Sequence, residues 1–344
     1  MCPSPEAWLA EWPLVGNAGP ISLLRRSLLA GRLAQAYLLV GPPRVGKFSL
    51  ALLLAQSLLC RETPRPCLDC TVCRRIQRCS HPDVALLGVA REEKEREREI
   101  GVDEVRAMQH LASLAPVEGT HKVVVVDGPE RMTRSAANAL LKTLEEPPSN
   151  VVMLLLAADE TGLLATVASR CQRIEMRRCG RAEIMALLGR VAHLTAEKQG
   201  EVLALAEGRP GWAVEAAVEG RLVEEFHRGV DRLLHLLGSD VPDRLRASET
   251  LAREYQESHE RLEAVFDTWR SWLRQTLLAL VLGPGGPAVR PLSEEAGRRF
   301  GLAAAIGLLR RLGETWQQLG HNANPRLAFD ALLLDMPYLD QSSG

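Results

Sequence analysis

Residues 36–59 are AYLLVGPPRVGKFSLALLLAQSLL: a short apolar run, a turn rich in Gly and Pro, and a long segment rich in Ala and Leu. Five apolar residues that end at a Gly-Pro turn predict a short buried strand. Ser49 to Leu59 predicts a helix, because Ala and Leu are strong helix formers. Gly41, Gly46 and Lys47 thus lie between a strand and a helix, where a phosphate-binding loop (P-loop) must lie. Backbone N–H groups would cradle phosphate there, and Lys47 would reach its outer oxygens.

Two further apolar strands follow, with a helix between them. Lys122 to Val126 ends at Asp127, and Val151 to Leu156 is the third apolar run. Thr133 to Glu146 predicts a helix that Thr133 caps and that Pro147-Pro148 stops. Strands that alternate with helices predict a parallel α/β sheet with buried strands.

The second half of the chain changes character. Beyond about residue 178 no further strand is evident, and Arg181 to Val191 and Thr195 to Glu207 predict helices. Long Leu-, Ala- and Arg-rich segments at helical spacing continue from about residue 221 to the end. We therefore expect α/β plus all-α architecture: an α/β domain over 1–178, a small helical domain over 179–220 and a larger helical domain over 221–344.

Composition excludes several classes of protein. The 344 residues carry 42 Lys and Arg against 43 Asp and Glu, a net charge of −1, so an electrostatically driven, free-standing nucleic-acid binder is not expected. The longest apolar runs fall far short of the roughly 20 residues that cross a bilayer. The first five residues lack the basic and apolar regions of a signal peptide. We expect a cytoplasmic protein without membrane contact.

Four of the eight cysteines fall within fourteen residues, in the pattern Cys60-x6-Cys67-x2-Cys70-x2-Cys73. In a reducing compartment such spacing favours metal over disulfides. Tetrahedral Zn²⁺ takes four thiolates, so we expect one structural zinc per chain, held in a loop. Free or redox-active thiols are the alternative. Cys79 and His81 are weaker candidate ligands.

Three positions that nucleotide hydrolysis requires carry unsuitable residues. Phe48 follows Lys47, where a Ser or Thr would bind Mg²⁺. Gly128 follows Asp127, where a glutamate would orient the attacking water, and Glu130 is two positions too far along. The third strand ends in Ala157-Ala158, where a polar sensor of the γ-phosphate is expected. We expect weakened binding of ATP and Mg²⁺ and a fold that persists after catalysis was lost.

Specific stretches then indicate a family. Residues 136–148 are AANALLKTLEEPP, residues 169–171 are SRC, and residues 322–334 are NANPRLAFDALLL. Together with the P-loop and the cysteine insert, they resemble the bacterial clamp-loader subunits of the AAA+ class, most closely the delta-prime subunits of DNA polymerase III. The resemblance covers nearly the whole chain. The departures at Phe48 and Gly128 are typical of delta-prime subunits and not of the motor subunits.

The resemblance implies a fold and a set of partners. It implies a RecA-like AAA+ domain with a zinc-binding insert at about 60–79, a helical lid and a helical collar that mediates oligomerisation. The family's subunits form a hetero-pentameric ring with gamma/tau motor subunits and a delta subunit. The ring loads the sliding clamp onto primed DNA. Membership connects the chain to a DNA-directed DNA polymerase, a nucleotidyltransferase, without polymerase activity of its own.

Arg170 of the SRC stretch is implied to act in trans as an arginine finger on a neighbour's nucleotide. A guanidinium presents a planar fork of donors, which suits a γ-phosphate that gains charge in the transition state. An ion pair with a local acid such as Glu175 is the alternative. Arg209 stands where AAA+ lids carry a nucleotide-sensing arginine, although a helix-capping role fits equally. Two other functions stay open: an active AAA+ motor ATPase, and a zinc-binding nucleic-acid protein unrelated to clamps.

Overall fold

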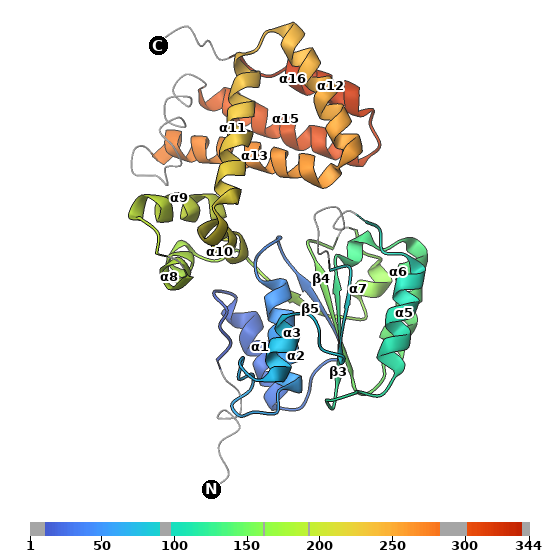
Figure 1. The fold of residues 1–344 in the computed structure, drawn as a ribbon. Coiled ribbons are helices and arrows are strands. Elements are labelled where there is room, and N and C mark those ends of the chain that lie inside the picture. Colours follow the sequence, from blue (N-terminus) through green and yellow to red (C-terminus); the bar gives the residue numbers. More distant parts are fainter. Residues whose placement is uncertain (1–10, 90–97, 161, 192, 283–300, 339–344) are drawn as a thin grey trace. The chain divides into compact units, whose positions relative to one another are not determined.

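The computed structural model describes residues 11–89, 98–160, 162–191, 193–282 and 301–338 (Figure 1). The chain divides into two compact units. Unit 1 is Met1–Leu187 with Gly208–Trp212, and unit 2 is Leu188–Glu207 with Ala213–Gly344. The α/β sheet lies in unit 1, and the elements described in unit 2 are helices.

The elements follow one another along the chain as strands and helices first and helices alone afterwards. In chain order they are α1 (Ala18–Leu29), β1 (Ala36–Val40), α2 (Lys47–Leu59), α3 (Thr71–Gln77), β2 (Val84–Leu87), α5 (Val102–Ser113), β3 (Lys122–Asp127), the 3₁₀ helix η2 (Pro129–Arg131), α6 (Arg134–Glu145), β4 (Val151–Ala157), α7 (Ala165–Ala168), β5 (Gln172–Glu175), α8 (Arg181–Val191), α9 (Ala196–Ala206), α10 (Pro210–Glu219), α11 (Arg221–Gly238), α12 (Val241–Glu257), α13 (His259–Leu282), α15 (Leu302–Gly320) and α16 (Pro325–Leu334).

The sheet has five parallel strands in the order β2-β3-β4-β1-β5. The three strands predicted from sequence, β1, β3 and β4, form its centre and are almost wholly buried. The two strands that the sequence pattern did not predict, β2 and β5, are its edges. Each has four residues with only one buried, so neither carries the continuous apolar run of a central strand.

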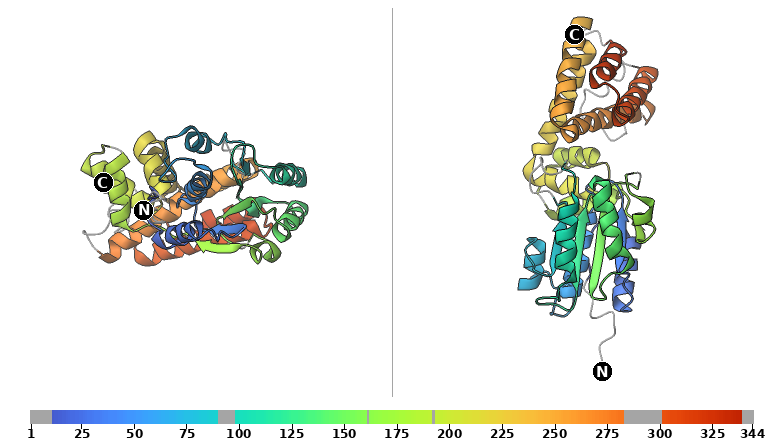
Figure 2. Two further views of the ribbon diagram at one scale, coloured as in Figure 1. Left: turned by 90° about the horizontal axis from the view of Figure 1, so that it is seen from below. Right: turned by 90° about the vertical axis from the view of Figure 1, so that its right-hand side faces the viewer.

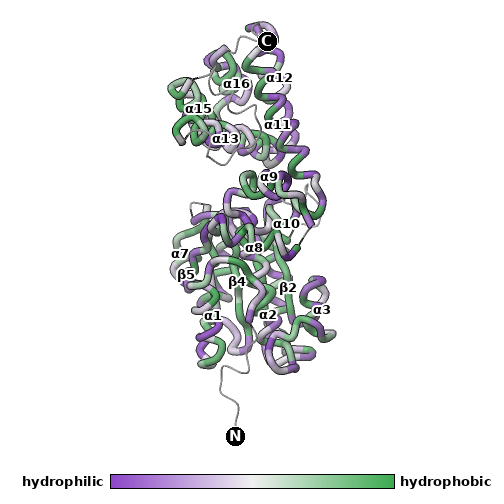
Figure 3. The backbone as a smooth tube through the Cα atoms, turned by 90° about the vertical axis from the view of Figure 1, so that its left-hand side faces the viewer, coloured by the Kyte–Doolittle hydropathy of each residue, from purple (hydrophilic) through white to green (hydrophobic). Residues whose placement is uncertain are grey.

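Alternate residues of the strands face opposite layers of helices, because side chains of a strand point alternately to its two faces. Tyr37 and Leu39 belong to a core shared with α1 and α2, whereas Leu38 and Val40 belong to a second core shared with α5, α6 and α7. Figure 1 shows these two layers, and the right-hand view of Figure 2 looks onto α5 and α6. The apolar strands are mostly green in Figure 3.

Helix boundaries follow the capping residues in the sequence. Thr133 is the N-cap of α6, and its hydroxyl accepts a hydrogen bond from the Ala136 N–H at 3.2 Å. Thr195 caps α9 in the same way. The helix predicted over Arg181 to Val191 is α8. Among the described residues, no helix combines the length and the hydropathy that a bilayer span requires.

One buried arginine joins three helices of unit 2. Arg244 of α12 is only 5% exposed, and its guanidinium donates six hydrogen bonds to backbone carbonyls. The acceptors, at 2.5–3.2 Å, are the carbonyls of Leu236, Leu237, Ser239, Leu333, Met336 and Pro337. They lie at the carboxyl ends of α11 and α16, where the last carbonyls lack partners within their helix and the helix dipole favours a cation.

We predict that replacing Arg244 weakens unit 2 more than replacing an exposed arginine of the same helix. Arg244→Met leaves six carbonyls without their donor, and Arg244→Lys cannot supply a planar fork. The expected loss of stability is about 3–5 kcal/mol for Arg244→Met. Urea unfolding followed by tryptophan fluorescence measures it. Arg246→Met, at a side chain that is 74% exposed, is the matched control and should change stability by less than about 0.5 kcal/mol. Equal midpoints for the two variants would contradict this role.

Candidate functional site

The carboxyl ends of β1, β4 and β3 form one edge of the sheet, because the three strands are parallel neighbours. The Gly41 N–H donates to the Ala157 carbonyl at 3.2 Å, and the Gly128 N–H donates to the Leu156 carbonyl at 3.0 Å. The loop over residues 41–46, the end of β3 at Asp127 and the end of β4 therefore meet. This is the edge where open α/β sheets bind ligands.

Two glycines shape the loop between β1 and α2. A Cβ on Gly41 would overlap the carbonyl oxygen of Met176, the residue just after β5, so the backbone approach requires glycine. Gly46 has φ +100°, which other residues adopt only with strain, and α2 begins at the next residue. The loop also contacts a later segment of unit 1, since the Gly211 N–H donates to the Arg44 carbonyl at 2.9 Å.

Lys47 lies against its own loop. Its Nζ donates hydrogen bonds to the carbonyls of Gly41 and Pro42, the second at 3.1 Å. Burial lowers the pKa of Lys47, and the negative charges of Asp127 and Glu130 oppose that shift. The four residues predicted for a nucleotide site, Gly41, Gly46, Lys47 and Asp127, thus lie at one edge of the sheet, with the lysine bonded to the loop's carbonyls.

The residue after Asp127 is Gly128, and the guanidinium of Arg131 fills the space where a side chain at position 128 would lie. Gly128 has φ +70°, and a Cβ there would lie 2.9 Å from Cζ of Arg131. The Arg131 Nη2 donates to the carbonyls of Gly88 at 2.5 Å and Asp127 at 2.7 Å, which holds the guanidinium over Gly128. A glutamate at position 128 would need both a strained backbone and the displacement of Arg131.

A carboxylate from η2 binds the end of β4. The Ala158 N–H donates to Oε1 of Glu130 at 3.2 Å, where a γ-phosphate sensor would otherwise stand. Phe48 packs beside the core that α1 and α2 share with the sheet, so it offers no metal ligand. Glu130 and Arg131 are the two residues at this edge that motif patterns did not assign. The Gly128-Pro129 turn directly after β3 is the signal that could have drawn attention to them.

The four clustered cysteines come together at one point. Their sulfur atoms all lie within 4.8 Å of one another, and three Sγ–Sγ distances are 3.6 Å (Cys60–Cys67), 3.9 Å (Cys60–Cys70) and 3.9 Å (Cys67–Cys73). Sulfurs about 2.3 Å from a tetrahedral zinc ion are about 3.8 Å apart. None of the seven cysteines within the described ranges is in a disulfide. The donor set therefore fits a tetrahedral metal ion.

Local backbone hydrogen bonds favour an ionised sulfur at Cys67, whereas burial raises the pKa of Cys60. The Cys70 N–H donates to Sγ of Cys67 at 3.3 Å, and the Cys73 N–H donates to Sγ of Cys70 at 3.4 Å. Burial works to raise the pKa of Cys67, but hydrogen bonds from the backbone and the neighbouring thiols outweigh it and lower this pKa to about 7. Burial raises the pKa of Cys73. The expectation of a loop for all four ligands was wrong at Cys73, which lies in α3.

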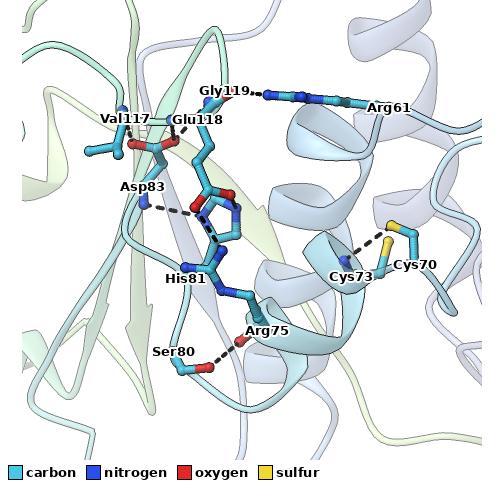
Figure 4. Close-up of polar contacts among 10 residues, drawn as sticks. All are labelled: Arg61, Cys70, Cys73, Arg75, Ser80, His81, Asp83, Val117, Glu118 and Gly119. Atoms are coloured by element: carbon cyan, nitrogen blue, oxygen red, sulfur yellow. Dashed lines mark hydrogen bonds and ion pairs between the residues drawn. The ribbon is translucent and has the colours of Figure 1, made fainter.

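Charged residues connect the cysteine cluster to the sheet (Figure 4). Arg75, two residues after Cys73, pairs with Glu118 at 2.7 Å. Asp83 precedes β2 and accepts the N–H groups of Val117, Glu118 and Gly119 at 2.6–2.8 Å. His81 is buried, and its Nδ1 accepts the Asp83 N–H at 3.1 Å. Among the described residues, the cluster that could hold a metal ion contains neither Cys79 nor His81.

Arg170 lies two residues after the short helix α7. Its Nη2 donates to Oε1 of Glu145 at 2.6 Å, and its Nη1 donates to the Thr166 carbonyl at 3.0 Å. Glu175, the acid named from sequence, instead pairs with Arg173 at 3.4 Å and Arg177 at 2.9 Å. Arg170 thus has a local acidic partner, and that partner is Glu145 at the end of α6.

Arg209 lies in the segment that packs beside the 41–46 loop. Its Cζ stands 5.8 Å from the centre of the Trp212 ring, a cation–π contact. Glu207, two residues before Arg209, is the C-cap of α9 and has a left-handed backbone conformation.

Comparison with known proteins identifies relatives over most of the chain. A family model described as DNA polymerase III, delta subunit, matches residues 16–179. The DNA polymerase III subunit delta' of Pseudomonas aeruginosa is 32% identical over 319 residues, which cover 90% of this chain and 94% of that protein.

Proteins named as tau or gamma subunits of DNA polymerase III are also similar to this chain. The DNA polymerase III subunit tau of Bacillus subtilis is 32% identical over 180 residues, which cover 52% of this chain. The chain thus spans 31% of the length of that relative. A solved structure of a DNA polymerase III gamma subunit-related protein from Thermotoga maritima aligns over 92% of this chain and 97% of its own, with a TM-score of 0.43 and 18% identity.

Proposed function

The chain belongs to the family of the DNA polymerase III delta' subunits, and from this premise we propose that it is a non-hydrolysing AAA+ subunit of a clamp loader. In this proposal it joins gamma/tau motor subunits and a delta subunit in a hetero-pentameric ring in the cytoplasm. The ring loads a sliding clamp onto primed DNA. Residues 1–178 form the AAA+ domain, 179–220 the lid and 221–344 the collar.

The guanidinium of Arg131 over Gly128 carries the proposal. Phosphoryl transfer needs a metal, a group that positions water and stabilisation of the transferring phosphoryl group. Arg131 fills the place of the water-positioning carboxylate, and Phe48 replaces the hydroxyl ligand of the metal. The carboxylate of Glu130 accepts a hydrogen bond from the Ala158 N–H at the end of β4. The proposal of a non-hydrolysing subunit rests on these changes taken together.

We predict that the purified chain hydrolyses ATP with Mg²⁺ only at background rate, because these groups are missing together. Steady-state phosphate release measures it. Lys47→Ala is the matched control, and its rate should equal that of the unaltered chain. A turnover of about 1 s⁻¹ that Lys47→Ala abolishes would instead support an active motor ATPase.

We also propose that Cys60, Cys67, Cys70 and Cys73 hold one structural Zn²⁺. Four protein ligands give a closed site without a position for reactive water. The ion would offset half of the negative charge of four thiolates in a short segment that has little core of its own, so it would fix the segment's shape.

We predict about one equivalent of zinc per purified chain by elemental analysis. The Cys67→Ser/Cys70→Ser variant removes two of four ligands and should lose the metal. Cys171→Ser, at a cysteine outside the cluster, should retain it. Zinc that persists in the double variant would show that the ligand assignment is wrong.

We propose that Arg170 serves a neighbouring motor subunit as an arginine finger. Its side chain is 36% exposed, and its ion pair with Glu145 is also open to solvent, so the guanidinium is accessible to a partner. Fingers supplied in trans raise phosphoryl-transfer rates by roughly 10³–10⁵.

We predict that Arg170→Ala leaves zinc content and ring assembly intact and lowers the clamp- and DNA-stimulated ATP turnover of the reconstituted ring. The loss is partial, because other motor sites retain their own fingers. Arg173→Ala is the matched control, since Arg173 is an exposed arginine that pairs with Glu160 and Glu175. If the Arg170→Ala ring assembles and turns over ATP like the unaltered ring, the finger assignment fails.

A further inference from the structure

We propose that Glu145 is the positioning residue of Arg170: together with the Thr166 carbonyl it holds the guanidinium in the orientation that reaches a neighbour's nucleotide. The inference rests on the proposed finger role of Arg170. It assigns a task to the first glutamate of the Glu145-Glu146-Pro147-Pro148 stretch that ends α6.

Two acceptors fix the two outer nitrogens of the fork. Nη2 of Arg170 donates to Oε1 of Glu145 at 2.6 Å, and Nη1 donates to the Thr166 carbonyl at 3.0 Å. The acceptors come from different elements, since Glu145 ends α6 and Thr166 lies in α7. A planar group held at two points from two packed elements has its orientation set by the fold.

The guanidinium of Arg170 retains N–H donors for a further anion. An arginine has five N–H groups, and these contacts use two of them. Within the described ranges, the other three have no hydrogen-bond partner in the structure. The guanidinium can therefore donate to a phosphate while it is still bound to Glu145, so the glutamate orients the arginine and does not sequester it. The 49% exposure of the Glu145 side chain agrees with an open pair.

The ion pair between Glu145 and Arg170 lies at the carboxyl end of α6, where an acidic residue is electrostatically unfavourable. The carboxyl end of a helix carries partial negative charge and favours cations. Here Glu145 and Glu146 both stand at that end, and Lys142 is the single basic residue of the last turn. Glu145 is unfavourable at this position unless a cation neutralises it, and Arg170 is that cation. The pairing thus gives a physical reason for an acid where helix electrostatics disfavours one.

The test uses the reconstituted ring with motor and delta subunits, sliding clamp and primed DNA. The Arg170-dependent turnover is the rate of the unaltered ring minus that of the Arg170→Ala ring. We expect Glu145→Ala to lower this part of kcat about three- to tenfold and to leave KM for ATP unchanged, because a misplaced finger weakens transition-state contacts only. Glu145→Gln retains an acceptor oxygen, so the turnover of its ring should lie between that of the unaltered ring and that of the Glu145→Ala ring.

Controls separate positioning from general charge and from folding. Glu146→Ala removes the neighbouring exposed acid and should leave turnover unchanged. The Glu145→Ala/Arg170→Ala double variant should match Arg170→Ala, because Glu145 acts through Arg170 alone. Thermal unfolding and zinc content of each isolated variant should equal those of the unaltered chain.

Failure of the inference is distinguishable from failure of the finger role. If Arg170→Ala leaves turnover unchanged, the finger role and this inference both fall. If Arg170→Ala lowers turnover while Glu145→Ala leaves it unchanged or raises it, the finger stands and the positioning role is overturned. An equal loss in Glu146→Ala, or a double variant clearly slower than Arg170→Ala, also overturns the positioning role.

Discussion

The hydrogen-bonded placement of β1 between β4 and β5 is the constraint on which the rest of unit 1 depends. The register sets Val40 opposite Ala157 on one side and Glu175 on the other, so the loop after β1 starts level with the ends of both neighbours. Only a glycine fits at position 41, because the backbone after β5 passes directly beside it. The same pairing aligns β3 through β4, which brings Asp127 and Gly128 to that edge. A slip by one residue would exchange the two apolar faces and dismantle both cores.

Three arginines, Arg131, Arg170 and Arg244, donate hydrogen bonds to backbone carbonyls. Backbone carbonyls at strand and helix ends lack regular partners, and a guanidinium can donate to several at once. Arg244 does this for two helix ends in unit 2, and Arg131 does it for the carbonyls of Gly88 and Asp127. Arg170 binds one carbonyl and one carboxylate. The surrounding acceptors decide whether such an arginine serves the fold alone or has donors to spare for another molecule.

Features with a local signal could be predicted from the sequence. The central strands, the cap at Thr133 and the cysteine spacing depend on neighbouring residues, and the structure has them where the pattern placed them. Features that depend on distant contacts could not. The edge strands β2 and β5 have only one buried residue each and take their form from pairing with β3 and β1. The sequence suggested Glu175 as the acidic partner of Arg170, and only the packing of α6 against α7 selects Glu145.

The proposed function, a subunit that does not hydrolyse ATP and serves a neighbour, accounts for two kinds of contact in unit 1. The charged groups at the carboxyl ends of β1, β3 and β4 have partners inside the protein, since an unpaired buried charge is costly. Lys47 bonds to the carbonyls of its own loop, Arg131 lies over Gly128, and Glu130 takes the Ala158 N–H. Arg170 differs from this group because its ion pair with Glu145 joins side chains that are 36% and 49% exposed, so its guanidinium is open to solvent. Internal partners at the nucleotide-site edge and an accessible guanidinium at Arg170 are the contacts that the proposed role in trans requires.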